Sequence, residues 1–161
     1  MVTLLLSSTI LFAAYIAAIA CKFGVPASIS DSYYLLEEKW KHAGLAFTLW
    51  CFLVGVTVMA CMFDASAGKT YQFLGLFAGG GLGFVGAAPL FKSRERTVHV
   101  ISAAACALAA ILWMGLSGYW IIAFSSLGAG IIAASFSRGK QVFWIESGIF
   151  LGVYLTLWIT R

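Results

Sequence analysis

Few residues of this chain can take part in chemistry, and the most informative one is an acid inside an apolar segment. Glu146 is the one charged residue in the run from Val142 to Ile159. A carboxylate inside a membrane segment is energetically costly, which makes such a residue a candidate functional group by default. Glu146 stands about 7 Å from the start of its segment, at 1.5 Å per helical residue. The alternatives are structural pairing with one of the basic residues at that end, which are Arg96, Arg138 and Lys140, or a side chain that stays protonated.

A histidine and a serine-rich loop complete the set of reactive groups. His99 opens another apolar segment, and imidazole titrates near neutrality, so it can act as base, proton relay or ligand. Ser28, Ser30 and Asp31 lie in the longest loop, and a serine, an acid and a histidine are the components of a hydrolase site. Helix capping by Ser30 or Asp31 explains the loop residues without chemistry. We take Glu146, His99, Ser28, Ser30 and Asp31 as one candidate polar site.

The composition of the chain indicates the environment of these groups. Of the 161 residues, 62% are hydrophobic and only 10% are charged, whereas soluble domains carry about 25% charged residues. So few charges cannot cover a water-exposed surface. The chain is therefore predicted to be an integral membrane protein in which any chemistry lies in the bilayer or at its edges.

The elements that position the site are predicted to be membrane-spanning helices. A span needs about 20 apolar residues, and the sequence offers six such segments, at residues 2–21, 44–62, 73–91, 98–116, 119–135 and 142–159. They predict an all-α transmembrane bundle, with residues 1–161 as a single domain. In the loop after the first span, Tyr33, Leu36 and Trp40 share one helical face, which predicts a short interfacial helix.

The distribution of basic residues predicts an orientation. The loops after the first, third and fifth spans hold eight of the ten Lys and Arg, and the other side holds only Lys69 and Arg161. Since cytoplasmic loops are enriched in basic residues, we expect those three loops in the cytoplasm and both termini outside, in the inner (plasma) membrane. Five tryptophans near the span ends are typical of an interfacial belt: Trp40, Trp113, Trp120, Trp144 and Trp158.

Glycine spacing predicts close helix packing. The segment from Gly81 to Gly86 matches GxGxxG, but a dinucleotide site needs a preceding strand and a βαβ unit, which an apolar span does not supply. Small residues four apart instead allow helix backbones to approach. Six positions have this spacing: Gly75, Gly79, Gly83 and Ala87 in the third span, with Gly148 and Gly152 in the sixth.

The remaining features argue against several other classes of protein. The four cysteines lie in or beside apolar segments without a CxxC pair, and the two histidines have no metal-finger spacing, so neither a metal nor another cofactor is expected. The net charge of +4 is scattered over short loops, with no basic face for nucleic acid. The expected partners are membrane lipids, a membrane protein or further copies of the chain.

Three stretches resemble parts of a group of proteins. They are the run from Phe23 to Ser30 with Tyr33 and Tyr34, the run from Phe84 to Pro89 together with Val98 and His99, and the run from Val142 to Glu146. They are similar to uncharacterised small six-span membrane proteins of bacteria and their phages, which carry a PxSIS-YY loop motif. This resemblance implies a six-span bundle and assigns no chemistry.

A more distant likeness is to membrane hydrolases of the alkaline-ceramidase type. Those enzymes use three histidines around a metal, whereas this chain has two histidines. Three hypotheses follow from the sequence. The first is a non-enzymatic bundle that binds lipid or a membrane partner. The second is a small transporter, channel or proton-coupled carrier that uses Glu146 and His99. The third is a lipid-modifying hydrolase with its site on the cytoplasmic side.

Overall fold

The computed structural model describes residues 1–161, apart from the side chains of Lys92 and Ser93. The fold is an all-α bundle, as the sequence predicts, and the described residues contain no strand. The elements in chain order are α1 (Val2–Phe23), α2 (Ser32–Lys39), α3 (Leu45–Ala65), α4 (Leu74–Ala87), the 3-10 helix η1 (Ala88–Arg94), α5 (Glu95–Leu116), α6 (Trp120–Ser135) and α7 (Gln141–Ile159).

Five segments are long and apolar enough to cross a membrane, namely α1, α3, α4 with the start of η1, α5 and α7. The sixth predicted span is α6, an apolar helix of 16 residues. Helices suit this composition because an apolar environment offers no water to the backbone, so each segment must satisfy its own N–H and C=O groups. The predicted interfacial helix is α2, which lies between α1 and α3.

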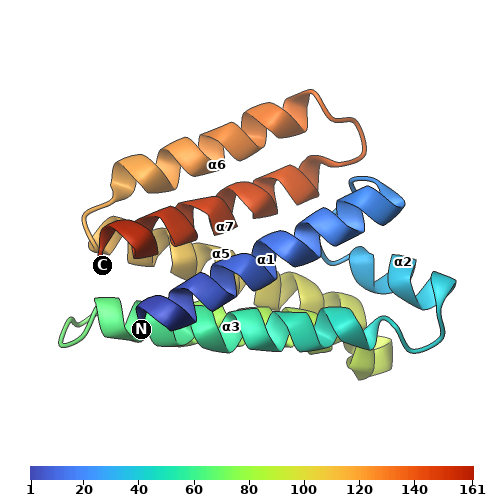
Figure 1. Cartoon of the computed structure of the whole chain (residues 1–161), viewed down its shortest axis with the longest axis horizontal. Helices are drawn as coiled ribbons and strands as arrows, with labels where there is room; N and C mark the ends of the chain where they lie inside the picture. The colour runs from blue at the N-terminus through green and yellow to red at the C-terminus, as the bar shows by residue number, and fades with distance from the viewer.

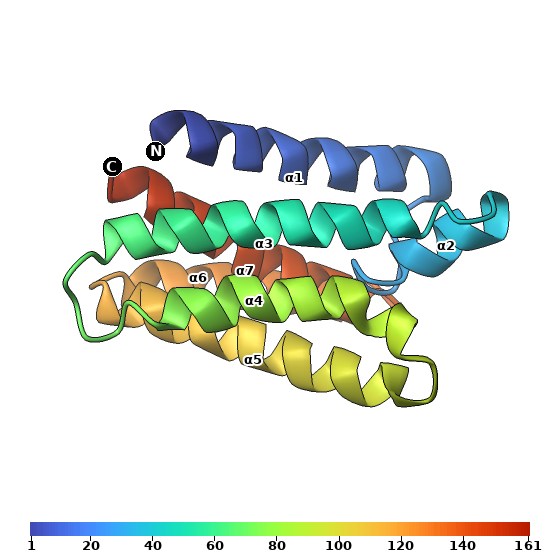
Figure 2. The same ribbon diagram turned by 90° about the horizontal axis from the view of Figure 1, so that it is seen from below.

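The long helices run roughly antiparallel to their chain neighbours. Figure 1 shows α6 beside α7 on one flank, α1 across the front, and both termini at the same end of the bundle. The turned view shows α3, α4 and α5 side by side, with α1 over α3 (Figure 2). The bundle therefore consists of a three-helix layer, α3–α4–α5, and a helix pair, α6–α7, with α1 covering the junction.

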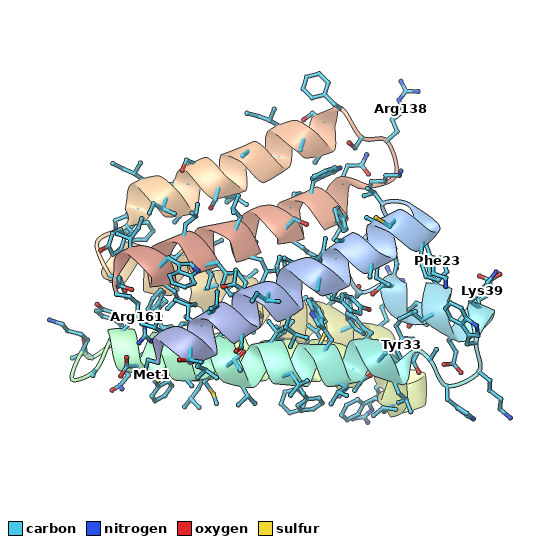
Figure 3. All side chains as sticks on the ribbon, viewed as in Figure 1. Met1, Phe23, Tyr33, Lys39, Arg138 and Arg161 are labelled. Atoms are coloured by element: carbon cyan, nitrogen blue, oxygen red, sulfur yellow. The ribbon has the colours of Figure 1, made fainter. Side chains whose placement is uncertain are left out.

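The two ends of the bundle differ in charge. Figure 3 places Phe23, Lys39 and Arg138 at one end, with Met1 and Arg161 at the other. The connections after α1, α4 and α6 lie at the first end, which we call the charged end because it holds eight of the ten basic residues. The side chain of one of them, Lys92, lies outside the described part. The alternation of loops thus matches the charge asymmetry read from the sequence.

The boundary between α4 and α5 differs from the predicted spans. The α-helix ends at Ala87 and passes into η1, and α5 begins at Glu95, before the predicted start at residue 98. Pro89 gives the reason, because proline has no N–H to donate to the carbonyl four residues earlier. The earlier start of α5 places His99 inside its first turns.

Small residues bring helices into backbone contact at two interfaces. A Cβ atom added to Gly79 would meet the Gly55 carbonyl of α3 and the Met59 side chain. In the other pair, a Cβ on Gly148 would lie 2.5 Å from the Ser126 carbonyl of α6. These positions permit close approach because a glycine has no side chain to hold the backbones apart. The partner glycine of α3, Gly55, was not singled out from the sequence.

The tryptophans do not all form the expected belt. Trp40, Trp120 and Trp158 are partly or largely exposed, but Trp113 is fully buried. Its indole N–H donates to Ser66 Oγ at 3.2 Å. For Trp113 the prediction of an interfacial anchor is therefore wrong, because a hydrogen-bond partner within the protein lets the indole pack in the core.

We predict that Gly79→Leu destabilises the bundle and that Gly80→Leu does not. The first substitution forces α3 and α4 apart, which is expected to cost at least about 1–3 kcal/mol as overpacking. Gly80 is the matched control, since a Cβ there would meet no atom within 4 Å. Thermal unfolding in detergent checks this, and equal melting of the two variants would contradict the packing.

Candidate functional site

The loop between α1 and α2, residues 24–31, folds on itself before it contacts the bundle. Gly24 leaves α1 with φ of +78°, a conformation that side chains other than glycine rarely adopt. The Asp31 carboxylate accepts the Ser28 N–H at 3.0 Å, and the Asp31 N–H donates to Ser28 Oγ at 3.1 Å. These two reciprocal hydrogen bonds define the shape of the loop.

The same loop is tied to α7 through its backbone. The Ile29 N–H donates to Glu146 Oε2 at 2.7 Å, and the Phe143 N–H donates to the Ala27 carbonyl at 3.0 Å. The Ile29 side chain is buried in the core. A loop with exposed backbone is not tolerated in a bilayer unless protein surrounds it, and here α7 supplies the partners. The loop thus closes the charged end of the bundle.

A hydroxyl contact ties the loop end to α1. The Ser32 hydroxyl donates to the Ile29 carbonyl at 2.6 Å, and Tyr15 O–H shares a hydrogen bond of 2.7 Å with Ser32 Oγ. Ser32 is almost fully buried. Neither Tyr15 nor Ser32 is identifiable from the sequence, because a single hydroxyl inside an apolar helix or after a loop has no distinctive spacing.

The histidine of the candidate site contacts the loop serines. His99 Nε2 lies 3.3 Å from Ser30 Oγ, which in turn lies 2.8 Å from Ser28 Oγ. Glu146 and His99 therefore contact successive residues of one loop, Ile29 and Ser30. The structure brings the five residues selected from the sequence to a single place between α5, α7 and the loop.

Two roles that the sequence suggests, an ion pair for Glu146 and a side-chain cap for Asp31, do not occur in the part of the chain that the structure describes. Among the described side chains the one ion pair joins Arg161 and Asp64, at 2.9 Å, at the opposite end from Glu146. Glu146 thus accepts a backbone N–H rather than pairing with Arg96, Arg138 or Lys140. Asp31 occupies the N-cap position of α2 without a side-chain capping bond, because its carboxylate turns back to Ser28.

A narrow apolar cavity, the inner cavity, extends from Glu146 into the bundle. Its volume is about 90 Å³. Its walls come from the loop and from α3, α4, α5 and α7, and consist of Ile29, Ser30, Phe47, Trp50, Cys51, Val58, Met62, Ala78, Leu82, Val85, Ala103, Cys106, Ala107, Ala110, Glu146, Ile149, Phe150 and Val153. Nearly all of these are apolar, so the cavity suits a hydrocarbon segment.

A larger and more polar cavity, the outer cavity, lies on the other side of Ser30. Its volume is about 790 Å³. Its lining includes every loop residue of the candidate site together with charged groups from the start of α5, and consists of Ala27, Ser28, Ser30, Asp31, Tyr34, Phe47, Val85, Ala88, Pro89, Glu95, Arg96, His99, Val100 and Val142. The two cavities share Ser30, Phe47 and Val85 as walls.

The turn from α2 to α3 is stabilised beside this site by Glu37. Its carboxylate accepts the His42 N–H and the Gly44 N–H, each at 3.0 Å. These hydrogen bonds to the backbone of His42 and Gly44 favour the charged form and lower the pKa of Glu37. Burial, with nearby Glu37 and Glu95, raises the pKa of Tyr33.

The described side chains of the site offer hydrogen-bond acceptors and a base. Among the described residues, no group of three or more His, Cys, Asp and Glu could hold a metal ion. Comparisons of the chain with protein families, with curated proteins and with solved structures found no match. The resemblances noted from the sequence therefore stay predictions, and the function must be argued from the cavities.

We predict that Glu146→Ala releases the 24–31 loop. The variant leaves the buried Ile29 N–H without its acceptor, at an expected cost of about 1–3 kcal/mol, and amide exchange of residues 27–31 should become faster. Glu146→Gln retains an acceptor oxygen and should protect the loop better than alanine. Exchange measured by mass spectrometry checks this, with the exposed Glu38→Ala as control. Unchanged exchange in Glu146→Ala would refute the role of this hydrogen bond.

Proposed function

We propose that this integral membrane protein binds an amphiphilic lipid at its charged end. In this proposal the polar head occupies the outer cavity, among Ser28, Asp31 and His99. An alkyl segment passes Ser30 into the inner cavity. The observation that carries the proposal is that two cavities share Ser30, Phe47 and Val85 as walls, while polar side chains make up half of the outer lining and little of the inner one.

The sizes of the cavities suit such a ligand. The outer cavity, at about 790 Å³, falls within the range of roughly 300–1,000 Å³ that is typical of small-molecule sites. The inner cavity is much smaller, at about 90 Å³. This size suits a short stretch of hydrocarbon chain.

The apolar lining of the inner cavity favours a bound hydrocarbon chain over water. Apolar cavities of this kind stay dry and take up apolar molecules, and most of the lining here is Phe, Trp, Val, Leu, Ile, Met and Ala. Ser30 lines both cavities, and Glu146 of the inner cavity wall accepts the N–H of the adjacent residue Ile29, so both stand where a head group would begin. The polar groups thus lie where the polar head of an amphiphile would join its hydrocarbon chain.

We predict that Ala107→Phe abolishes lipid retention and that Ala104→Phe does not. Ala107 lines the inner cavity, whereas Ala104, one turn earlier on the same helix, is exposed on the outer surface. A phenyl ring at residue 107 fills the space that the alkyl segment needs. Native mass spectrometry of the detergent-purified proteins should show bound lipid on wild type and Ala104→Phe, and at least a tenfold smaller bound fraction on Ala107→Phe.

If Ala107→Phe does not fold, Ala107→Val replaces it in the experiment. Its smaller side chain should lower lipid retention by a lesser amount. Melting temperatures are measured for every variant, so that loss of fold is separated from loss of ligand. A wild-type protein that carries no lipid, or equal retention in Ala107→Phe and Ala104→Phe, would contradict the proposal.

The contact between Ser30 Oγ and His99 Nε2 favours a second candidate function, hydrolysis of a bound lipid ester. A histidine next to a serine can accept the hydroxyl proton as the serine attacks a carbonyl. Against it, the loop acid Asp31 bonds to Ser28 rather than orienting His99. Release of fatty acid by wild type but not by Ser30→Ala, in the same lipid-loaded preparations, would favour hydrolysis over binding alone.

We further propose that the charged end faces the cytoplasm in the inner (plasma) membrane, with both termini outside. This rests on the eight basic residues at that end against two at the other. A C-terminal alkaline phosphatase fusion should therefore be active, and a C-terminal green fluorescent protein fusion dark when exported unfolded. The reverse pair of results would invert the orientation.

A further inference from the structure

Glu146 is the one acidic residue in the wall of the inner cavity, and that wall contains no Lys, Arg or His among the described residues. One of its oxygens, Oε2, is held by the Ile29 N–H. The basic residues closest in sequence, Arg138 and Lys140, are exposed, and Arg96 lines the outer cavity. No cationic side chain of the described residues therefore pairs with this carboxylate.

A carboxylate in a membrane span without an opposite charge is costly, and charged groups there are normally paired. The site has space for a pairing group, because Glu146 lies in the wall of a cavity rather than in a closed core. A bound cation would supply the missing charge. The cavity's apolar walls require that cation to be attached to hydrocarbon.

The groups around Glu146 suit an ammonium. Ser30 Oγ, at the boundary of both cavities, is a further acceptor. Trp50 and Phe47 line the inner cavity, and aromatic faces attract cations. An anionic head beside Glu146 would meet like-charge repulsion, whereas an uncharged hydroxyl would gain a hydrogen bond without the ion pair.

We propose that the bound amphiphile is an alkyl primary amine whose ammonium lies beside Ser30, the residue that lines both cavities, and pairs there with Glu146 of the inner cavity wall. Its first methylene groups then lie in the inner cavity. This inference rests on the proposed function, since it names the head group of the lipid that the cavities receive. It assigns Glu146 the role of the head-group ligand, in addition to holding Ile29.

Three probes of equal chain length test the head group, namely dodecylamine, dodecanol and dodecanoate. Saturable binding to protein in nanodiscs is measured, with empty nanodiscs subtracted. Wild type should bind the amine at least tenfold more tightly than the alcohol and should bind dodecanoate least. Glu146→Gln, which retains the size and one acceptor, should bind amine and alcohol equally, while Glu38→Gln should match wild type.

The outcomes separate the two proposals. Saturable binding of dodecanol or dodecanoate as tight as that of the amine in wild type would overturn the amine inference and leave lipid binding standing. Saturable binding of none of the three probes would overturn both. Selectivity for the amine that persists in Glu146→Gln would remove Glu146 from recognition. Glu146→Asp, which retains the charge, should preserve the preference for the amine and serves if the glutamine variant does not fold.

Discussion

The hydrogen bond from the Ile29 backbone to Glu146 is the contact on which the charged end of the bundle depends. It joins an irregular loop to α7 at a depth where unpaired backbone groups are costly. Because Ile29 is held there, its neighbour Ser30 is presented to His99 and Ser28 turns toward Asp31. One carboxylate therefore both closes the bundle and sets the wall between the two cavities.

The position of the inner cavity follows from how the helices pack. Where small residues face one another, as between Gly79 and Gly55 or Gly148 and Gly130, the helix backbones approach each other closely. Between the three-helix layer and the α6–α7 pair the contacts are made by large rings instead, such as Trp50 and Phe150 with centroids 6.4 Å apart. These rings hold the helix backbones apart without filling the gap completely, and the inner cavity lies in the space that remains.

The sequence was sufficient for the fold class and for the grouping of polar residues by depth. Apolar length predicted the helices, and the counts of Lys and Arg predicted which loops share an end. The same reasoning could not find the partner of Glu146, because a backbone N–H is present at every residue and carries no side-chain signal. It also could not find the walls of the cavities, since Phe47 or Ala107 is indistinguishable by type from residues that face lipid.

The glycine spacing was informative on one side of each interface only. Gly79 and Gly148 stand in regular stripes. Their partner Gly55 has no Gly, Ala or Ser four positions away on α3, whereas Gly130 lies between Ser126 and Ala134 at that spacing and was not selected from the sequence. A single small residue gives no spacing pattern. A stripe therefore identifies a packing face but does not identify the helix that packs against it. Which helices pair is decided by the whole bundle, with the short turn at Gly118 and the loop after α3 setting the chain order.

The 16 residues of α6 have a consequence for the surrounding lipids. At 1.5 Å per residue this helix is about 24 Å long, while α1, with 22 residues, reaches about 33 Å and the hydrocarbon layer is about 30 Å thick. In a bilayer, α6 would therefore be shorter than the hydrocarbon layer and α1 slightly longer. Beside α6 the bilayer would thin or the bundle would tilt, which favours lipids with shorter or more disordered chains along that side.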